Sequence, residues 1–379
     1  MSLKKSYYFL IFIIFAFFGL YSTFQFSHAD FIYASSAISN GSLYDSLNFL
    51  QAPLAFYVLK FFKFFTPESI PLYLIIRLQA LFFTIFPYLI ISLLFKDIKL
   101  KILLALAFTS NFFIQSVPIM AGSYGLALSF LTLSIYLLIK VFNYFFLKEE
   151  LLIKSPNLYL FLSGVCITLA TSAKINFLIY LFPYLIIILY LKIRVKKGIL
   201  TFSLLGLLVG STPIIFYLIN ENFGFILNNI SFHSNYVADR RGLTSLSKIK
   251  SMYNGGVKWI QYGGSFSITS IFLWYLSRIK LKEKIFDNIS FILFSFLIFS
   301  FVAALIPMTF KPQYWYQASF FSISLAAYFS QYVVSKKNSY FFLGIFCLLI
   351  VVQIQSFLPN LVRSFEKGNG IFQVLEINK

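Results

Sequence analysis

The sequence predicts an all-α polytopic membrane protein, and three observations carry that prediction. Hydrophobic residues make up 59% of the 379 positions and charged residues only 11%, against roughly 45–50% and 25% in soluble globular chains. Mean hydropathy is +0.84, and aromatic residues reach 21%. A soluble fold has no interior large enough for so much apolar side chain, so most of it must face lipid. Soluble enzymes, disordered tails and coiled coils are thereby excluded.

Eleven apolar runs divide the chain, and each approaches the roughly 20 residues that a spanning helix needs. The runs are 7–21, 72–95, 102–118, 122–147, 158–173, 176–191, 199–219, 265–277, 285–307, 314–335 and 339–357. We therefore expect about 11 transmembrane helices in one domain over 1–357, followed by a short extracytoplasmic tail over 358–379. The long connections 28–71 and 220–264 are expected to form extracytoplasmic loops.

A shorter segment over 52–65 is apolar except for Lys60 and Lys63. These lysines are three positions apart and so share one face of a helix. A helix with one cationic face and one aromatic face is typical of the membrane surface. We therefore expect an interfacial helix here, within the first outer loop.

The cations fix the expected orientation. The formal net charge is +19, but the cations form short clusters between apolar runs and not one basic face, which argues against a nucleic-acid partner. Seventeen of the 31 lie in alternate short connections: Lys4, Lys5, Lys96, Lys99, Lys101, Lys148, Lys154, Lys192, Arg194, Lys196, Lys197, Arg278, Lys280, Lys282, Lys284, Lys336 and Lys337. Such clusters stay cytoplasmic. We expect a multi-pass protein of the cell (inner) membrane with its N-terminus cytoplasmic and its C-terminus extracytoplasmic.

Any chemistry is therefore expected on the extracytoplasmic side. The cytoplasmic connections are too short for a nucleotide-binding domain, and no phosphate-binding GxxxxGK[ST] motif occurs. Among the few outer acids, Asp30 lies directly at the end of the first run. An acid at a membrane boundary is a functional candidate. The alternative, a helix N-cap for 31–39, remains open because Asp caps well.

Three pieces of the first loop, HADFIY at 28–33, GSLYD at 41–45 and QAPLAFY at 51–57, resemble the first outer loop of the GT-C membrane glycosyltransferases. The resemblance is to the bacterial protein-mannosyltransferase-like and lipopolysaccharide-core (Rgt-type) branch of that family. GVCITLATSAK at 164–174 and KPQYWY at 311–316 resemble two later motifs. The resemblance implies a GT-C-like fold whose first outer loop carries interfacial helices.

The resemblance also implies the activity. Such enzymes are expected to move a sugar from a polyprenyl-phosphate donor to a hydroxyl of a glycan, lipid or protein acceptor, with inversion. Asp30 would be the general base, with Asp45 orienting the acceptor or helping to hold a divalent cation, Mg²⁺ or Mn²⁺. The implied donor-phosphate partners are Lys174, Arg240, Arg241 and Lys311, since a lipid phosphate leaves as an anion. The implied acceptor or sugar contacts are Tyr33, Tyr44, Gln51, Tyr57, His233 and Tyr316.

The chain departs from the family pattern at three places. Ala29 stands where many relatives have a second acid, so Asp30 is alone there. Gln51 and Ala52 replace a basic residue and the first of two prolines. After the third run, AGSY at 121–124 stands where relatives carry an acid or Arg.

Structural interpretations compete for several of these residues. Lys174 ends an apolar run and could be a lysine that snorkels to the interface. Tyr314, Trp315 and Tyr316 could form an interfacial aromatic belt. Arg240 and Arg241 could lie in a solvated loop.

Two other functions fit the same hydropathy pattern. A lipid-linked polysaccharide polymerase or ligase would depend on Arg240 and Arg241 and would not need Asp30. A lipid-linked-sugar flippase or transporter would show an internal repeat and polar breaks within the spans. The sequence shows no convincing repeat, and we favour the glycosyltransferase.

Overall fold

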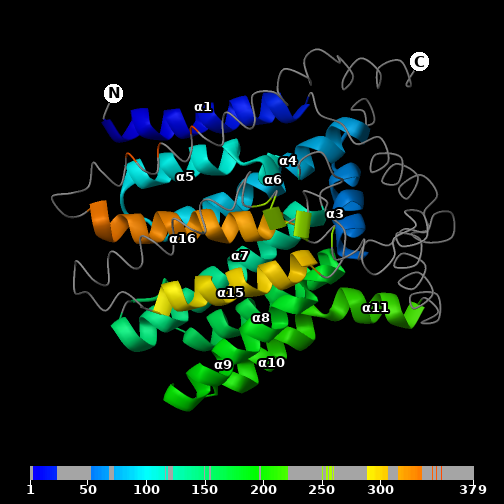
Figure 1. Cartoon of the computed structure of the whole chain (residues 1–379). Coiled ribbons are helices and arrows are strands. Elements are labelled where there is room, and N and C mark those ends of the chain that lie inside the picture. The colour runs from blue at the N-terminus through cyan, green and yellow to red at the C-terminus, as the bar shows by residue number, and fades with distance from the viewer. Residues whose placement is uncertain are drawn as a thin grey trace.

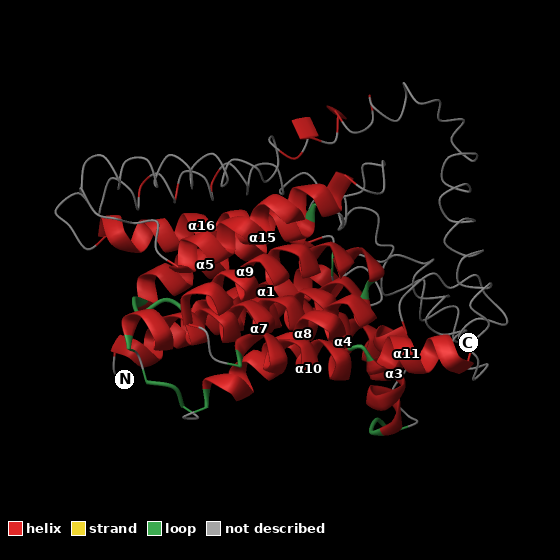
Figure 2. Cartoon of the chain, turned by 90° about the horizontal axis from the view of Figure 1, so that it is seen from below, coloured by secondary structure: helices red, strands yellow, loops and turns green. Residues whose placement is uncertain are grey.

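The computed structural model describes residues 3–23, 53–67, 72–115, 117, 123–148, 150–152, 155–195, 198–220, 250, 253–254, 256–257, 259, 288–305, 315–334, 344, 347 and 351. Within these residues all regular structure is helical, and no strand occurs (Figure 2). Four helices are long and apolar enough to cross a membrane: Ile75–Ser92, Ser123–Leu147, Pro156–Ala173 and Ile175–Val195. Shorter apolar helices cover Ser6–Gly19, Ile199–Gly210 and Ile289–Leu305. The prediction of an all-α membrane protein is thereby confirmed.

The long helices lie side by side in one bundle (Figure 1). The elements are α1 (Leu3–Thr23), α3 (Pro53–Phe64), α4 (Leu72–Ser92), α5 (Ile98–Ser110), α6 (Phe112–Gln115), α7 (Ser123–Phe142), the π-helix η1 (Asn143–Leu147), α8 (Pro156–Ala173), the 3₁₀-helix η2 (Ile175–Tyr180), α9 (Leu181–Val195), α10 (Ile199–Gly210), α11 (Thr212–Asn220), α15 (Asn288–Leu305) and α16 (Tyr316–Val334). Helices thus occupy nine of the predicted runs. The runs 265–277 and 339–357 lie outside the described residues except for isolated positions, so eleven spans stay a prediction.

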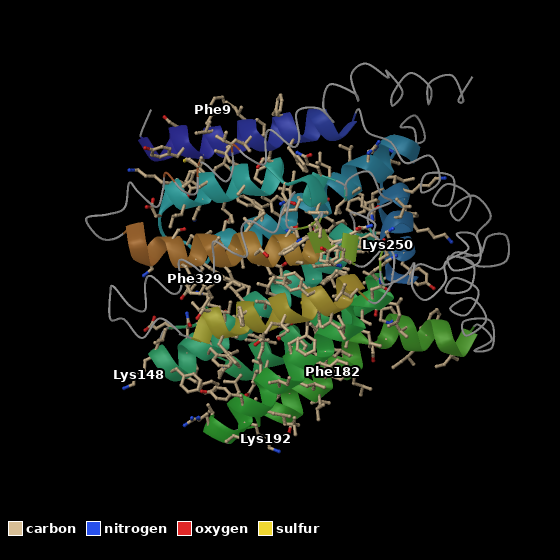
Figure 3. The ribbon with its side chains drawn as sticks, viewed as in Figure 1. Phe9, Lys148, Phe182, Lys192, Lys250 and Phe329 are labelled. Carbon is tan, nitrogen blue, oxygen red and sulfur yellow. The ribbon has the colours of Figure 1, made fainter. Side chains whose placement is uncertain are left out.

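The bundle has two different ends. The N-terminus and the turns from α4 to α5, from η1 to α8 and from α9 to α10 lie at one end, which we call the basic end (Figure 1). Lys148 and Lys192 lie there, whereas Lys250 lies toward the opposite end (Figure 3). At that opposite end, which we call the α3 end, α3 runs crosswise to the bundle (Figure 1). The described clusters of cations predicted to share one side of the membrane therefore do share one end of the molecule.

Two predicted runs are broken by local sequence. The run 102–118 is divided at Asn111, whose Oδ1 accepts the backbone N–H groups of Phe113 and Ile114 at 3.0 and 3.3 Å. Asn111 thereby ends α5 and begins α6, as short polar side chains do at helix starts. The run 199–219 is divided at Ser211, just before Pro213, which cannot continue the backbone ladder of α10.

Small residues bring the backbones of α8 and α10 close together. A methyl group on Gly164 would lie 2.6 Å from the backbone oxygen of Ser203, and one on Gly206 would clash with the backbone oxygen of Phe161. Gly206 and Gly210 are four positions apart, the spacing of close-packed membrane helices. Small residues also join α7 to α8, where the Ser134 hydroxyl donates to the Ser163 carbonyl oxygen at 2.8 Å.

Burial separates inner from outer helices. Every residue of α16 from Tyr316 to Ser330 is buried, and α7 is also buried almost throughout. By contrast, Phe9 on α1 and Phe182 on α9 expose 56% and 59% of their surface (Figure 3). A soluble protein would hide such side chains, so we assign these outward faces to lipid.

Candidate functional site

Three of the predicted site residues lie within the described part of the chain: Tyr57, Lys174 and Tyr316. Nine lie outside it: Asp30, Tyr33, Tyr44, Asp45, Gln51, His233, Arg240, Arg241 and Lys311. Their roles stay predictions from the sequence. The described residues show which side chains gather at the α3 end of the bundle.

Lys174 is fixed at a sharp break between two helices. It ends α8, donating its backbone N–H to the Ala170 oxygen at 3.0 Å. Its own oxygen accepts the N–H of Phe177 at 2.9 Å, which begins η2. Because the backbone of Lys174 is extended, its side chain leaves the helix at the α3 end with both neighbouring turns held in place.

The ammonium of Lys174 lies over an aromatic ring. Its Nζ is 4.5 Å from the centre of the Tyr124 ring, within the range of a cation–π interaction worth about 0.5–2 kcal/mol. Tyr124 lies in the first turn of α7 and is buried, and Lys174 itself is only partly exposed. The cation is thus held at the bundle end and does not simply extend into solvent as a snorkelling lysine would.

Tyr124 is a site residue that the sequence analysis did not assign. It belongs to the segment 121–124, which departs from the family pattern of an acid or Arg after the third span. The sequence thus marks this segment as unusual for the family that it resembles. Only the packing of α7 against α8 shows that Tyr124 faces Lys174.

Arg77 is a second cation that sequence reasoning left out of the site. It lies in the second turn of α4 and is only 7% exposed. An ionisable side chain inside a membrane helix is costly, and such residues usually serve function. Since α4 begins at the α3 end, Arg77 lies toward the same end as Lys174.

Helix α3 buries part of its surface against the bundle. Ala55 and Leu59, one turn apart, are buried, and the helix packs against α4, α8 and α11. Lys60 and Lys63 are both exposed, as are the phenylalanines around them, so the shared cationic face stays a prediction from their spacing. Tyr57 is 38% exposed, so a molecule at the membrane surface could reach it.

Aromatic side chains gather where α16 begins. The rings of Trp259 and Trp315 stack with centroids 5.9 Å apart, and Phe301 meets Trp259 edge-on at 4.8 Å. Trp315 and Tyr316 are 4% and 0% exposed. The alternative of an interfacial belt is therefore wrong for these two residues, because their side chains pack inside the bundle.

Charge is distributed unequally between the ends. Of the residues that the structure describes, the only carboxylates are Asp97 and Glu150, and both belong to turns at the basic end. The described part of the α3 end contributes cations: Lys60, Lys63, Arg77, Lys174 and Lys250. This arrangement can hold an anion such as a phosphate. A general base would have to come from the remaining parts of the chain, where Asp30 lies.

Metal binding is not tested by this geometry. Within the described ranges no three His, Cys, Asp or Glu side chains group together as metal ligands, but Asp30 and Asp45 lie outside those ranges. The divalent cation stays a prediction.

Comparisons of the chain with family models, with curated proteins and with solved structures found no match to any of them.

Proposed function

We propose that the chain is a membrane glycosyltransferase that moves a sugar from a polyprenyl-phosphate donor to an acceptor hydroxyl. The observation that carries the proposal is the fixed position of Lys174, partly buried over Tyr124 at the α3 end. Transfer from a lipid phosphate releases an anion, which needs a positioned cation and no acid. The resemblance of the first loop and of 164–174 to GT-C enzymes points to the same chemistry.

Arg77 supports the phosphate assignment. A guanidinium binds two phosphate oxygens at once, and burial strengthens each charged interaction because less water competes for it. Arg77 and Lys174 come from α4 and α8, two helices that α3 contacts. Arg240, Arg241 and Lys311 would add further phosphate contacts from the outer connections.

The exposed face of α3 suits a lipid-linked donor. Phe61, Phe64 and Phe65 expose 61%, 84% and 68% of their surface next to Lys60 and Lys63. Aromatic rings and lysines in this arrangement bind the boundary between acyl chains and anionic headgroups. In the proposed topology of about 11 spans, α3 lies on the outer surface of the cell membrane, with the N-terminus cytoplasmic.

The proposed reaction is a single inverting displacement. The acceptor oxygen attacks the anomeric carbon of the sugar while the bond from that carbon to the phosphate oxygen breaks. Asp30 takes the proton of the acceptor hydroxyl, and the polyprenyl phosphate leaves as an anion beside Lys174 and Arg77. Asp45 would orient the acceptor or help to hold a divalent cation that shields the phosphate.

The test is direct transfer by the purified protein in detergent or vesicles. Polyprenyl phosphates carrying radiolabelled mannose, glucose, galactose or arabinose are incubated with envelope extract as acceptor, and released polyprenyl phosphate is measured. We expect release with one of these donors and incorporation of its label. Labelled lipid that crosses vesicles unchanged would instead indicate a flippase, and release that is lost in Arg240→Gln but not in Asp30→Asn would indicate a polymerase or ligase.

A further inference from the structure

Asn111, Tyr316 and Gln317, where α5 ends and α16 begins, each carry a buried polar atom that lacks a hydrogen-bond partner among the described residues. These atoms are Nδ2 of Asn111, the hydroxyl of Tyr316 and Oε1 of Gln317, and their residues are 0%, 0% and 2% exposed. Leaving a buried polar group unpaired is costly, and native proteins pair such groups with protein, water or ligand. These three atoms are therefore candidates for binding a ligand.

The helix register brings these atoms into one layer. Phe108 of α5 and Phe320 of α16 meet edge-on with ring centroids 5.8 Å apart. The two helices run in opposite directions (Figure 1). Asn111 lies three residues beyond Phe108, and Tyr316 and Gln317 lie four and three residues before Phe320. All three are thus about one helical turn nearer the α3 end than the Phe108–Phe320 contact.

The chemistry of the layer is that of a hydroxyl-binding site. Asn111 is oriented by the two backbone N–H groups that its Oδ1 accepts, so its amide nitrogen remains as a donor. Gln317 offers an acceptor, and the Tyr316 hydroxyl can act as either. None of these three residues is charged, so their polar atoms suit the hydroxyl groups of a neutral polyol better than a phosphate.

Aromatic surface lies beside the polar atoms. Phe113 and Trp315, close in sequence to Asn111 and Tyr316, pack in one cluster with Trp259. Trp259 is itself held by its Nε1–H, which donates to the Ser319 hydroxyl at 3.3 Å. A small-molecule site usually has an apolar, aromatic wall that carries a few polar groups. Sugar rings match such a wall because they present both hydroxyls and apolar C–H faces.

We propose that this layer binds the hydroxyl groups of the sugar carried by the donor, with Asn111, Tyr316 and Gln317 as sugar-binding residues. This inference rests on the proposed function and assigns the sugar to residues other than the phosphate partners Lys174 and Arg77.

The test uses Tyr316→Phe, Gln317→Met and the double variant, which remove the polar atoms but keep the side-chain shape. Asn111 is left intact because it caps α6. If the atoms bind sugar, the double variant should bind the transferred polyprenyl-phosphate sugar about tenfold more weakly. Its affinity for bare polyprenyl phosphate should not change. Tyr184→Phe, at a fully buried tyrosine on α9, is the matched control and should leave both affinities unchanged.

Melting temperature separates a structural role from a ligand role. Removing unpaired polar atoms should leave the melting temperature equal or higher, so weaker sugar binding by an equally stable variant supports the inference. Unchanged affinity for the sugar-carrying lipid shows that water alone occupies the layer and overturns the inference, while the proposed function stands. Absence of any transfer by the wild-type protein overturns the proposed function, and this inference falls with it.

Discussion

The basic end and the α3 end use the same residue types differently. At the basic end, Lys192 is exposed to solvent, and Asp97 caps α5 by accepting the Lys99 N–H at 2.9 Å. At the α3 end, Lys174 is partly buried over Tyr124, and Arg77 lies inside α4. Exposed charges cost little and can set orientation in the membrane. Desolvated ones are costly, so they are retained where they bind something.

The largest expected effect concerns which side of the membrane each end faces, and it is all-or-none. In a Cys347→Ser background, which removes the exposed cysteine, Lys63→Cys on α3 should react with an impermeant thiol reagent in intact cells. Lys192→Cys should react only after the cells are permeabilised, because the short clusters of cations at the basic end are predicted to be cytoplasmic. The reverse labelling would show that the assigned orientation is wrong and that Lys174 faces the cytoplasm.

Asp30 and Asp97 give the next largest contrast. Asp30→Asn should lower sugar transfer by roughly 10²–10⁴-fold, the usual contribution of a positioned base, while donor binding persists. Asp97→Asn should leave transfer unchanged, since Asn also caps a helix. Transfer rates and donor binding are measured for both variants. Near wild-type transfer by Asp30→Asn would show that Asp30 is only a cap and would sink the proposed mechanism.

Lys174 and Lys192 test whether buried and exposed cations differ as proposed. Lys174→Gln should weaken donor binding by about 10- to 100-fold, since it removes a charged hydrogen bond to phosphate. Lys192→Gln should have no effect on binding. The assay is equilibrium binding of bare polyprenyl phosphate to each purified variant. Equal affinities would show that Lys174 does not bind the donor phosphate.

The smallest effect is expected from a tyrosine at the basic end. The hydroxyl of Tyr88 donates to the Lys101 carbonyl oxygen at 2.9 Å and so ties α4 to α5. Tyr88→Phe should destabilise the protein by about 1 kcal/mol and leave transfer unchanged. Thermal unfolding in detergent measures the loss. A defect in transfer without a loss of stability would contradict the division of roles between the two ends.

Much of the fold could be predicted from the sequence because lipid imposes a simple rule. Backbone groups in a membrane must bond within the helix, so each apolar run near spanning length becomes a helix, as α4, α7 and α8 do. The exposure of Lys60 and Lys63 on α3 followed from the sequence. The breaks at Asn111 and Ser211 did not, because a single side-chain cap or a proline changes a run without changing its hydropathy.

The candidate site depended on tertiary structure to a greater degree. Composition and charge by themselves determined a helical membrane protein whose short basic connections share one end, because burial and loop charge act through local sequence. Only packing decided that Lys174 meets Tyr124, that Tyr316 is buried, and that, among the described residues, Asn111 and Gln317 keep unpaired polar atoms in the interior. These residues are far apart in the chain, and no local sequence pattern predicts which helices pack against each other. Contacts such as that of Gly206 with α8 determine which helices pack together, because membrane helices associate through surfaces that fit closely.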